Sequence, residues 1–451
     1  MRSALFLVFF LALVPVCFFR PFVGILAWTW IDYLNPHRFT WGFAQQLPVA
    51  LLVAIATVLG FVFSKRRSLP PLTLETILLL LLWFWYALTT VGVYFSPEFF
   101  HHFPETIARL TFVSKILLMT FFAIMIVNDR QRLHWWYLVT AGSLALLSLK
   151  GFVFGLATGG QYRIYGPADS MLTDNNAFAL ALNMCLPMFF FLAKVETRRW
   201  IRFALWGSFV ISIVTVILTY SRGGLIGLSV VALALAFKSK HRLAAITTLV
   251  LAGLLVLTFA PEKWTARMGT IQTAREKDAS AHNRINSWTL AVRIALDYPI
   301  LGGGFDTFTA PVYDRYSLRE EADVLGPHSI YFQILAEHGF PGLLLFLGLI
   351  CSSLWSCWKV QRTFSRNTVA RWPAAYANMV FVSLLGYAAS GAFLGLAYFD
   401  LFYQVIGTAA IVKYLARQEL ARERTENLES PSEARVVPQP VWKNYAPAPS
   451  K

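Results

Sequence analysis

Between residues 326 and 342 the chain reads GPHSIYFQILAEHGFPG. A polar loop, residues 261–327, leads into this stretch, and a long apolar run follows it. Nearly all of the remaining sequence is apolar, so this loop is the one segment large and polar enough to house chemistry. His328 lies where the chain leaves the loop and is expected to re-enter a membrane.

The overall composition is that of a membrane protein. Of 451 residues, 57% are hydrophobic and 14% are charged, with a mean hydropathy of +0.56, whereas a soluble domain carries about 25% charged residues. We therefore predict an all-α, polytopic transmembrane helical bundle with about twelve spans of about 20 residues each. The first apolar stretch, 4–34, is interrupted by Arg20 and Pro21, and it is either one span plus a re-entrant piece or two short spans. The other candidate spans are 47–63, 74–95, 108–127, 135–155, 176–195, 202–220, 223–237, 243–260, 329–360, 374–396 and 401–414.

Lysine and arginine residues concentrate in every second loop between the spans, namely 65–67, 130–132, 198–202, 238–242 and 359–371. Positively charged loops stay on the cytoplasmic side of a membrane. The alternate loops, which include 261–327, are therefore predicted to be external, and periplasmic in a Gram-negative cell. The net charge of +15 then indicates contact with anionic membrane lipids and not with nucleic acid. The predicted regions are an N-terminal transmembrane region (1–200), a core (201–417) and a disordered cytoplasmic tail (418–451).

The long loop contains a helical pattern of its own. Ile285, Trp288, Val292 and Leu296 recur on one face, which predicts an amphipathic helix that lies against the membrane surface. Three glycines follow at 302–304, and they predict a flexible turn in which the backbone could approach a ligand closely.

Polar residues on the predicted external side are candidates for a functional site, because ionisable groups at a membrane boundary are costly. Tyr220, Ser221 and Arg222 stand between two apolar runs and directly before two glycines. A guanidinium beside bare backbone suits a bound anion. The alternative is an arginine that snorkels and only anchors the helix end.

Two further sets carry arginine. Arg163 is the only cation of its loop and precedes Asn175 at the start of a span, where Asp174 or Asn175 could instead cap the helix. Arg284 lies one helical turn before Trp288. Because several other arginines share that loop, Arg284 could also be a solvated loop cation.

His328 and His338 form the fourth set. A neutral imidazole accepts a proton near pH 7, which makes His328 a candidate general base. His338 is ten residues on, about 15 Å along a helix, and we expect it to be a buried, hydrogen-bonded histidine. No carboxylate cluster completes a metal site with either histidine, so we predict neither a metal nor another cofactor.

These residue types suit one kind of substrate. Arginines bind phosphate or pyrophosphate in a bidentate manner, and an external enzyme has no ATP, so the energy must arrive in the substrate. A lipid-linked pyrophosphate sugar meets both conditions. Guanidiniums would neutralise the leaving pyrophosphate while a histidine deprotonates the acceptor hydroxyl.

Short motifs in the second half resemble a known group. His328, Ser329, nine residues, Gly339, two residues and Gly342 match the pattern His-[Asn/Ser/Gln]-x9-Gly-x-x-[Gly/Thr/Tyr] of bacterial O-antigen ligases. Their superfamily includes O-antigen polymerases and protein O-oligosaccharyltransferases. Residues 219–224 resemble its Ser-Arg turn, and 284–305 resemble its loop segment of Arg, Trp and a glycine-rich turn.

Motifs in the first half resemble a narrower subgroup, the exosortase-associated O-glycosylation ligases. The strings that carry this resemblance are RPFVG (20–24), WTW (28–30), NPHR (35–38) and DNN (174–176).

The resemblance implies a metal-independent, inverting glycosyltransferase of the GT-C type in the bacterial inner membrane. It would transfer polysaccharide from undecaprenyl pyrophosphate to a hydroxyl of the lipid A core, with His328 as the catalytic histidine and Arg222 and Arg284 engaging the pyrophosphate. A polymerase or a protein O-oligosaccharyltransferase with another acceptor stays open. The alternative of a different class, a transporter for a lipid-linked anion, would be expected to show inverted repeats and broken helices.

Overall fold

The computed structural model describes residues 2–40, 42–65, 68–259, 264, 279–317, 324–365 and 371–429. Within these residues the chain is α-helical, with three short 3-10 turns and no strand. The all-α prediction is therefore confirmed. The parts of loop 261–327 between these ranges, and the tail from residue 430 on, lie outside the described residues.

The first apolar stretch forms two helices. They are α1 (Arg2–Phe19) and α2 (Pro21–Leu34), which break at Arg20. Pro21 occupies the first turn of α2, where its missing N–H costs no hydrogen bond. Residues 4–34 therefore form two short helices, and both pack against α3 (Val49–Phe63), while the choice between two spans and one span plus a re-entrant piece stays open.

Helix α7 (Asn175–Val195) is the centre of the bundle. Its residues are apolar on nearly all sides, which is typical of a helix that is surrounded by other helices. In its most apolar stretch 83% of the residues are buried. Asp174 caps it, because its Oδ1 accepts hydrogen bonds from the backbone N–H groups of Asn176 (2.8 Å) and Ala177 (3.3 Å). The helices packed around α7 are α6 (Arg130–Ala157), α8 (Arg199–Leu218), α9 (Arg222–Phe237) and α16 (Trp372–Gly391).

Six of the described helices are long and apolar enough to cross a membrane, which supports a multi-pass membrane protein. They are α4 (Leu74–Phe95), α5 (Phe103–Ile126, with Phe100–His102 before it), α6, α7, α8 and α15 (Ile330–Phe364). Shorter apolar helices include α3, α9 and part of α10 (Arg242–Phe259). The total of about twelve spans stays a prediction.

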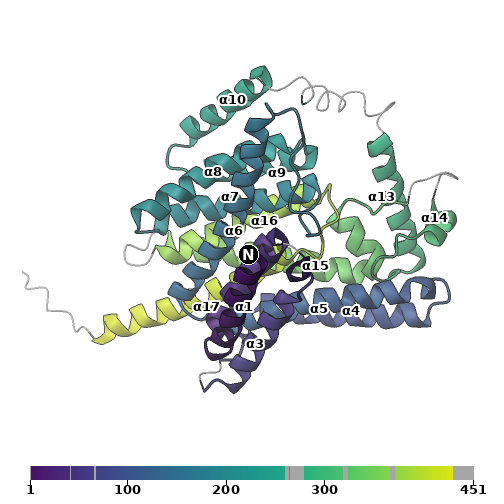
Figure 1. Cartoon of the computed structure of the whole chain (residues 1–451), viewed down its shortest axis with the longest axis horizontal. Coiled ribbons are helices and arrows are strands. Elements are labelled where there is room, and N and C mark those ends of the chain that lie inside the picture. The colour runs from purple at the N-terminus through teal and green to yellow at the C-terminus, as the bar shows by residue number, and fades with distance from the viewer. Residues whose placement is uncertain are drawn as a thin grey trace, which may run out of the picture.

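The loops predicted to share one side of the membrane contact one another. On the predicted external side, Glu98 pairs with Arg315 (2.8 Å), and the Tyr220 hydroxyl donates to the Gly160 carbonyl (2.5 Å). At the lysine- and arginine-rich side, Lys238 donates to Gln361 (2.7 Å). Figure 1 shows α13 (Ala279–Asp297) and α14 (Ala310–Tyr316) at one end of the molecule, while the last helix, α17 (Asp400–Glu429), extends from the opposite end.

The predicted tail boundary at residue 418 needs correction. Helix α17 continues through Glu429, and Leu420 packs against the buried core. Residues 418–429 are charged but consist largely of strong helix formers such as Ala, Leu, Gln, Glu and Arg. Charge alone therefore does not predict disorder here, and Pro431 is the first helix breaker after residue 418.

Candidate active site

His328 lies at a sharp entry into α15. Its backbone has φ +45°, a left-handed conformation that is uncommon for residues other than glycine. Ser329 is buried and extended and serves as the N-cap residue of α15. The turn leaves the imidazole half-buried at the start of the helix. Tyr220, in the Ser-Arg turn, also has a positive φ, +58°.

Helix α13 lies across this entry. Its Leu290, Ala291 and Ile294 are fully buried, whereas Ile285 and Leu296 are 58% and 65% exposed. The predicted helix is confirmed, but much of the predicted apolar stripe faces away from the protein, because the neighbouring face that carries Leu290, Ala291 and Ile294 packs against α15 and α14. Contact of the outer face with the membrane surface stays a prediction.

Trp288 and Arg284 connect α13 to His328. The Trp288 indole donates to the carbonyl of Pro327 (2.7 Å), and its ring stacks on Phe332 with centroids 5.1 Å apart. Burial lowers the pKa of His328, the charge of Arg284 lowers it further, and Asp174 acts in the opposite direction. The imidazole is therefore subject to the opposing charges of Arg284 and Asp174, and burial biases it toward its neutral form.

The Ser-Arg turn is fixed to the start of α7. The Ser221 hydroxyl accepts from the backbone N–H of Gly224 (2.9 Å) and donates to Asn176 Oδ1 (2.7 Å). Asn175 donates its side-chain amide to the Thr219 carbonyl (2.8 Å) and is buried. Asn175 therefore positions the turn, and Asp174, not Asn175, supplies the cap of α7. These bonds place Arg222 as the first residue of α9.

The segment between α16 and α17 brings these parts together. A Cβ placed on Gly223 would lie 3.2 Å from the Cβ of Phe393, and the Phe393 ring is 6.4 Å from that of Trp288. A Cβ placed on Gly395 would lie 3.8 Å from the backbone nitrogen of His328. Gly223, which follows Arg222, therefore borders the same short segment as Trp288 and the backbone of His328. The sequence patterns missed Phe393 and Gly395, since both stand in an otherwise apolar stretch.

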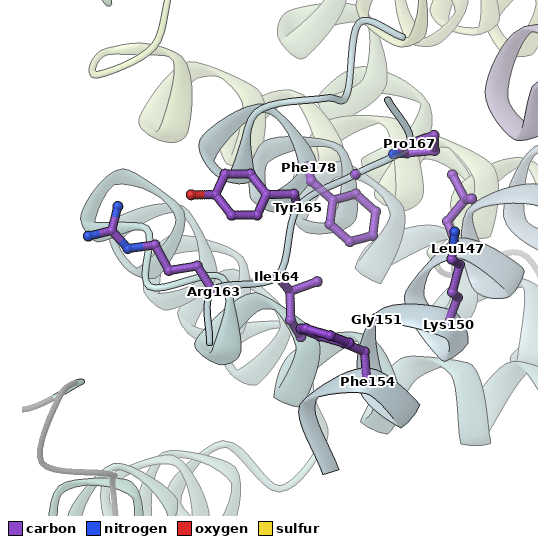
Figure 2. A pocket seen from close by; sticks show the side chains of 10 residues that line it. Leu147, Lys150, Gly151, Phe154, Arg163, Ile164, Tyr165, Pro167 and Phe178 are labelled. Atoms are coloured by element: carbon purple, nitrogen blue, oxygen red, sulfur yellow. The ribbon is translucent and has the colours of Figure 1, made fainter. Parts of the chain in front are cut away.

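Arg163 belongs to a neighbouring cavity. This cavity has a volume of about 260 Å³ and is lined by apolar side chains of α6 and α7 and by residues 163–167. Figure 2 shows Arg163 at one side of it and Lys150 at the other. The charge of Arg163 acts on Tyr220, whose pKa is nevertheless raised because burial is the larger effect. Arg163 is therefore close enough to Tyr220 of the Ser-Arg turn for its charge to affect that side chain.

His338 is buried in a hydrogen-bond network, as expected. Its Nδ1 is 2.8 Å from the Thr89 hydroxyl, and its Nε2 is 2.8 Å from the Tyr398 hydroxyl. The Tyr398 hydroxyl also donates to Glu337. Both ring nitrogens are therefore occupied by partners inside the bundle.

The glycine turn has a different role from the predicted one. Gly303 and Gly304 donate to the carbonyls of Ala336 and Glu337, both at 2.8 Å. Gly339 has φ +66°, which breaks α15 and leaves these carbonyls without helical partners. The backbone approaches the broken helix, not a ligand, and the predicted continuous span 329–360 is interrupted at Gly339.

No group of three His, Cys, Asp or Glu side chains in the described part of the chain could hold a metal ion.

Two family models match the chain. Residues 207–347 match the family described as O-Antigen ligase, and residues 1–197 match a family of unknown function (DUF5935). A comparison with curated proteins found no match. The exosortase-associated subgroup stays a prediction. The first match contains Arg222, Arg284 and His328, and it supports placing this chain in the O-antigen ligase superfamily of membrane enzymes.

Proposed function

We propose that this protein is an O-antigen ligase that transfers a glycan from undecaprenyl pyrophosphate to a hydroxyl of the lipid A core. The reaction would occur at the periplasmic face of the inner membrane, the side that the alternation of lysine- and arginine-rich loops predicts for loop 261–327 and for the entry of α15. The carrying observation is that the three separate segments that carry Arg222, Arg284 and His328 meet at residues 393–395, where Gly223, Trp288 and the backbone of His328 are the neighbours.

His328 would act as the general base. The acceptor hydroxyl gives its proton to the imidazole as its oxygen attacks the anomeric carbon of the donor sugar. The bond between that carbon and the pyrophosphate oxygen breaks on the opposite face, so the configuration inverts and undecaprenyl pyrophosphate leaves. The lowered pKa of His328 keeps the imidazole neutral at pH 7 and able to accept the proton.

Arg222 and Arg284 would bind the leaving pyrophosphate. A guanidinium offers two parallel N–H donors that match the phosphate oxygens. Arg222 also stands at the N-terminus of α9, where the helix dipole favours an anion. Charge that develops on the leaving group would thus be stabilised without a bound metal ion.

Ser221, Tyr220, Asn175 and Trp288 would hold these groups in place. The bonds from Ser221 and Asn175 fix the turn that carries Arg222, and the Trp288 indole fixes Pro327 beside His328. His338 would support the same helix from within the bundle.

The decisive test is a transfer assay with the purified protein. Lipid-linked polysaccharide and rough lipopolysaccharide would be incubated with it in vesicles containing a metal chelator. A conjugate of polysaccharide and lipopolysaccharide supports the proposal. Polymer growth on the donor would instead indicate a polymerase, transfer to a protein would indicate an oligosaccharyltransferase, and translocation of an unchanged donor would indicate a carrier.

A further inference from the structure

A second cation-lined cavity lies at the other end of α15, between α4, α15 and α17. Its volume is about 400 Å³, and its lining includes Lys359, Lys413, Arg417, Trp355 and Leu74. The glycan-transfer proposal uses none of these residues. The cavity lies among the loops that are rich in lysine and arginine, so it faces the membrane leaflet opposite to His328.

The cavity carries an excess of positive charge. Lys413 pairs with Glu75 at 3.1 Å, and Glu75 is fully buried and also accepts from the Ser356 hydroxyl. Lys359 lies over the Trp355 ring, with its Nζ 5.1 Å from the centroid. Within the described residues, neither Lys359 nor Arg417 is paired with a carboxylate. Two of the three cations are therefore available to an anion, and phosphate is the anion that their donors suit.

An apolar stripe begins at this cavity. Leu74, which lines the cavity, starts a row of exposed side chains at helical spacing on α4, followed by Ile77, Leu81, Phe84 and Leu88. Fourteen residues of helix separate the first from the last, a length of about 21 Å. This length suits a fatty acyl chain that lies along the helix.

Two tryptophans mark the level of the membrane surface. Trp355 and Trp358 are 56% and 39% exposed, and their rings stack with centroids 4.9 Å apart. Exposed tryptophan at the end of a spanning helix is typical of the headgroup level of a bilayer. Trp355 also lines the cavity, so the cavity lies at the depth of lipid phosphates.

We propose that this cavity binds the phosphate headgroup of an anionic phospholipid. Lys359 and Arg417 contact the phosphate, Lys413 is held in place by Glu75, and an acyl chain follows the stripe on α4. The stripe and the tryptophan pair favour a lipid over a soluble phosphate, which would use the cations but not the apolar row. Basic pockets between spanning helices on the cytoplasmic side bind anionic headgroups in this way.

The test compares lipid retention by two charge-matched variants. The protein, Lys359→Gln/Arg417→Gln and the control Lys240→Gln/Arg362→Gln would be placed in nanodiscs of phosphatidylcholine with a minor fraction of phosphatidylglycerol. Bound lipids are then counted by native mass spectrometry. Arg362 and Lys240 are exposed cations of the same end that do not line the cavity. Lys413 is kept because its loss would leave Glu75 buried without its partner.

The parent protein and the control are expected to retain phosphatidylglycerol over phosphatidylcholine, and the cavity variant to retain about tenfold less. Phosphatidylglycerol should also raise the unfolding temperature of the first two only, whereas all three proteins should unfold alike in pure phosphatidylcholine. Equal loss of phosphatidylglycerol in both variants would overturn the proposal. Displacement of the lipid by an equal concentration of glycerol phosphate would also overturn it, in favour of a soluble ligand.

Discussion

The two histidines of α15 and its entry differ in what surrounds their rings. His328 is half-buried, no hydrogen bond joins its ring to another described residue, and the charges of Arg284 and Asp174 both reach it. His338 is fully buried, and both its nitrogens are within 2.8 Å of hydroxyl groups. An imidazole with an available nitrogen can accept a substrate proton, whereas one with two internal partners holds the fold. Residue type alone does not distinguish these roles.

The same contrast applies to the polar groups around each ring. Near His328, the arginines come from segments that meet only through backbone and aromatic contacts at 393–395. Around His338, the partners bond directly to one another, and Glu337 also accepts from the backbone of Asp306 (3.3 Å). Removal of one group should therefore affect chemistry at the first ring and stability at the second.

The largest expected effect is that of His328→Ala on transfer. Loss of a general base typically costs about 10²–10⁴ in rate, while binding of the donor lipid and the unfolding temperature should stay unchanged. Product formation in vesicles, donor binding and thermal unfolding would be measured on the same preparation. Transfer at the parent rate would remove the general-base role of His328.

Arg222→Lys should be nearly as damaging as Arg222→Ala. An ammonium keeps the charge but lacks the fork that binds two phosphate oxygens, and loss of one such stabilising donor costs about 10²–10³ in rate. The matched control is Arg38→Lys, because Arg38 is a cation of the same predicted side that pairs with Asp169. Full activity of Arg222→Lys would show that charge alone is enough.

Tyr398→Phe should reverse the pattern of His328→Ala. Removal of this hydroxyl takes one buried hydrogen-bond partner from Glu337 and one from His338, which costs about 1–3 kcal/mol of stability. Thermal unfolding in detergent should therefore change more than the transfer rate of the folded fraction. A stable but inactive variant would instead place Tyr398 in the reaction.

The sequence predicts the helices better than it predicts their contacts. Apolar runs locate the main apolar helices, and the short motifs select Arg222, Arg284 and His328 as candidate site residues. The break at Gly339 is not predicted, because a single glycine in an apolar run is compatible with a continuous helix. The hydrogen bonds from residues 299–304 that replace the helical ones at the break come from a distant part of the sequence. The buried face of α13 is also missed, since two apolar faces overlap in its sequence. Residues 393–395 neighbour His328 in the structure but lie more than sixty residues away in the sequence. Hydrophobic periodicity reports only local structure, so it does not predict this contact.

The smallest expected effect is on the pH dependence, and its sign tests which charges reach His328. Transfer requires the neutral imidazole, so the rate falls as the pH drops through the pKa of His328, which lies below its usual value of 6.5. Arg284→Gln removes a cation that opposes protonation, so the pKa rises and activity is lost at a higher pH. Asp174→Asn removes an anion that favours protonation, so the loss moves to a lower pH, while Asn still caps α7. Each shift should be less than about one pH unit.

The two profiles would be compared after each is scaled to its own maximum, because Arg284→Gln is also expected to weaken pyrophosphate binding. Opposite shifts mean that both charges act on the group that titrates in the reaction. Shifts in the same direction, or an unchanged acid limb in both variants, would mean that the titrating group is not His328. His328 would then not be the general base, because the protonation state of a general base must control the rate. The two histidines would still differ in burial and in hydrogen bonding, but not in a catalytic role.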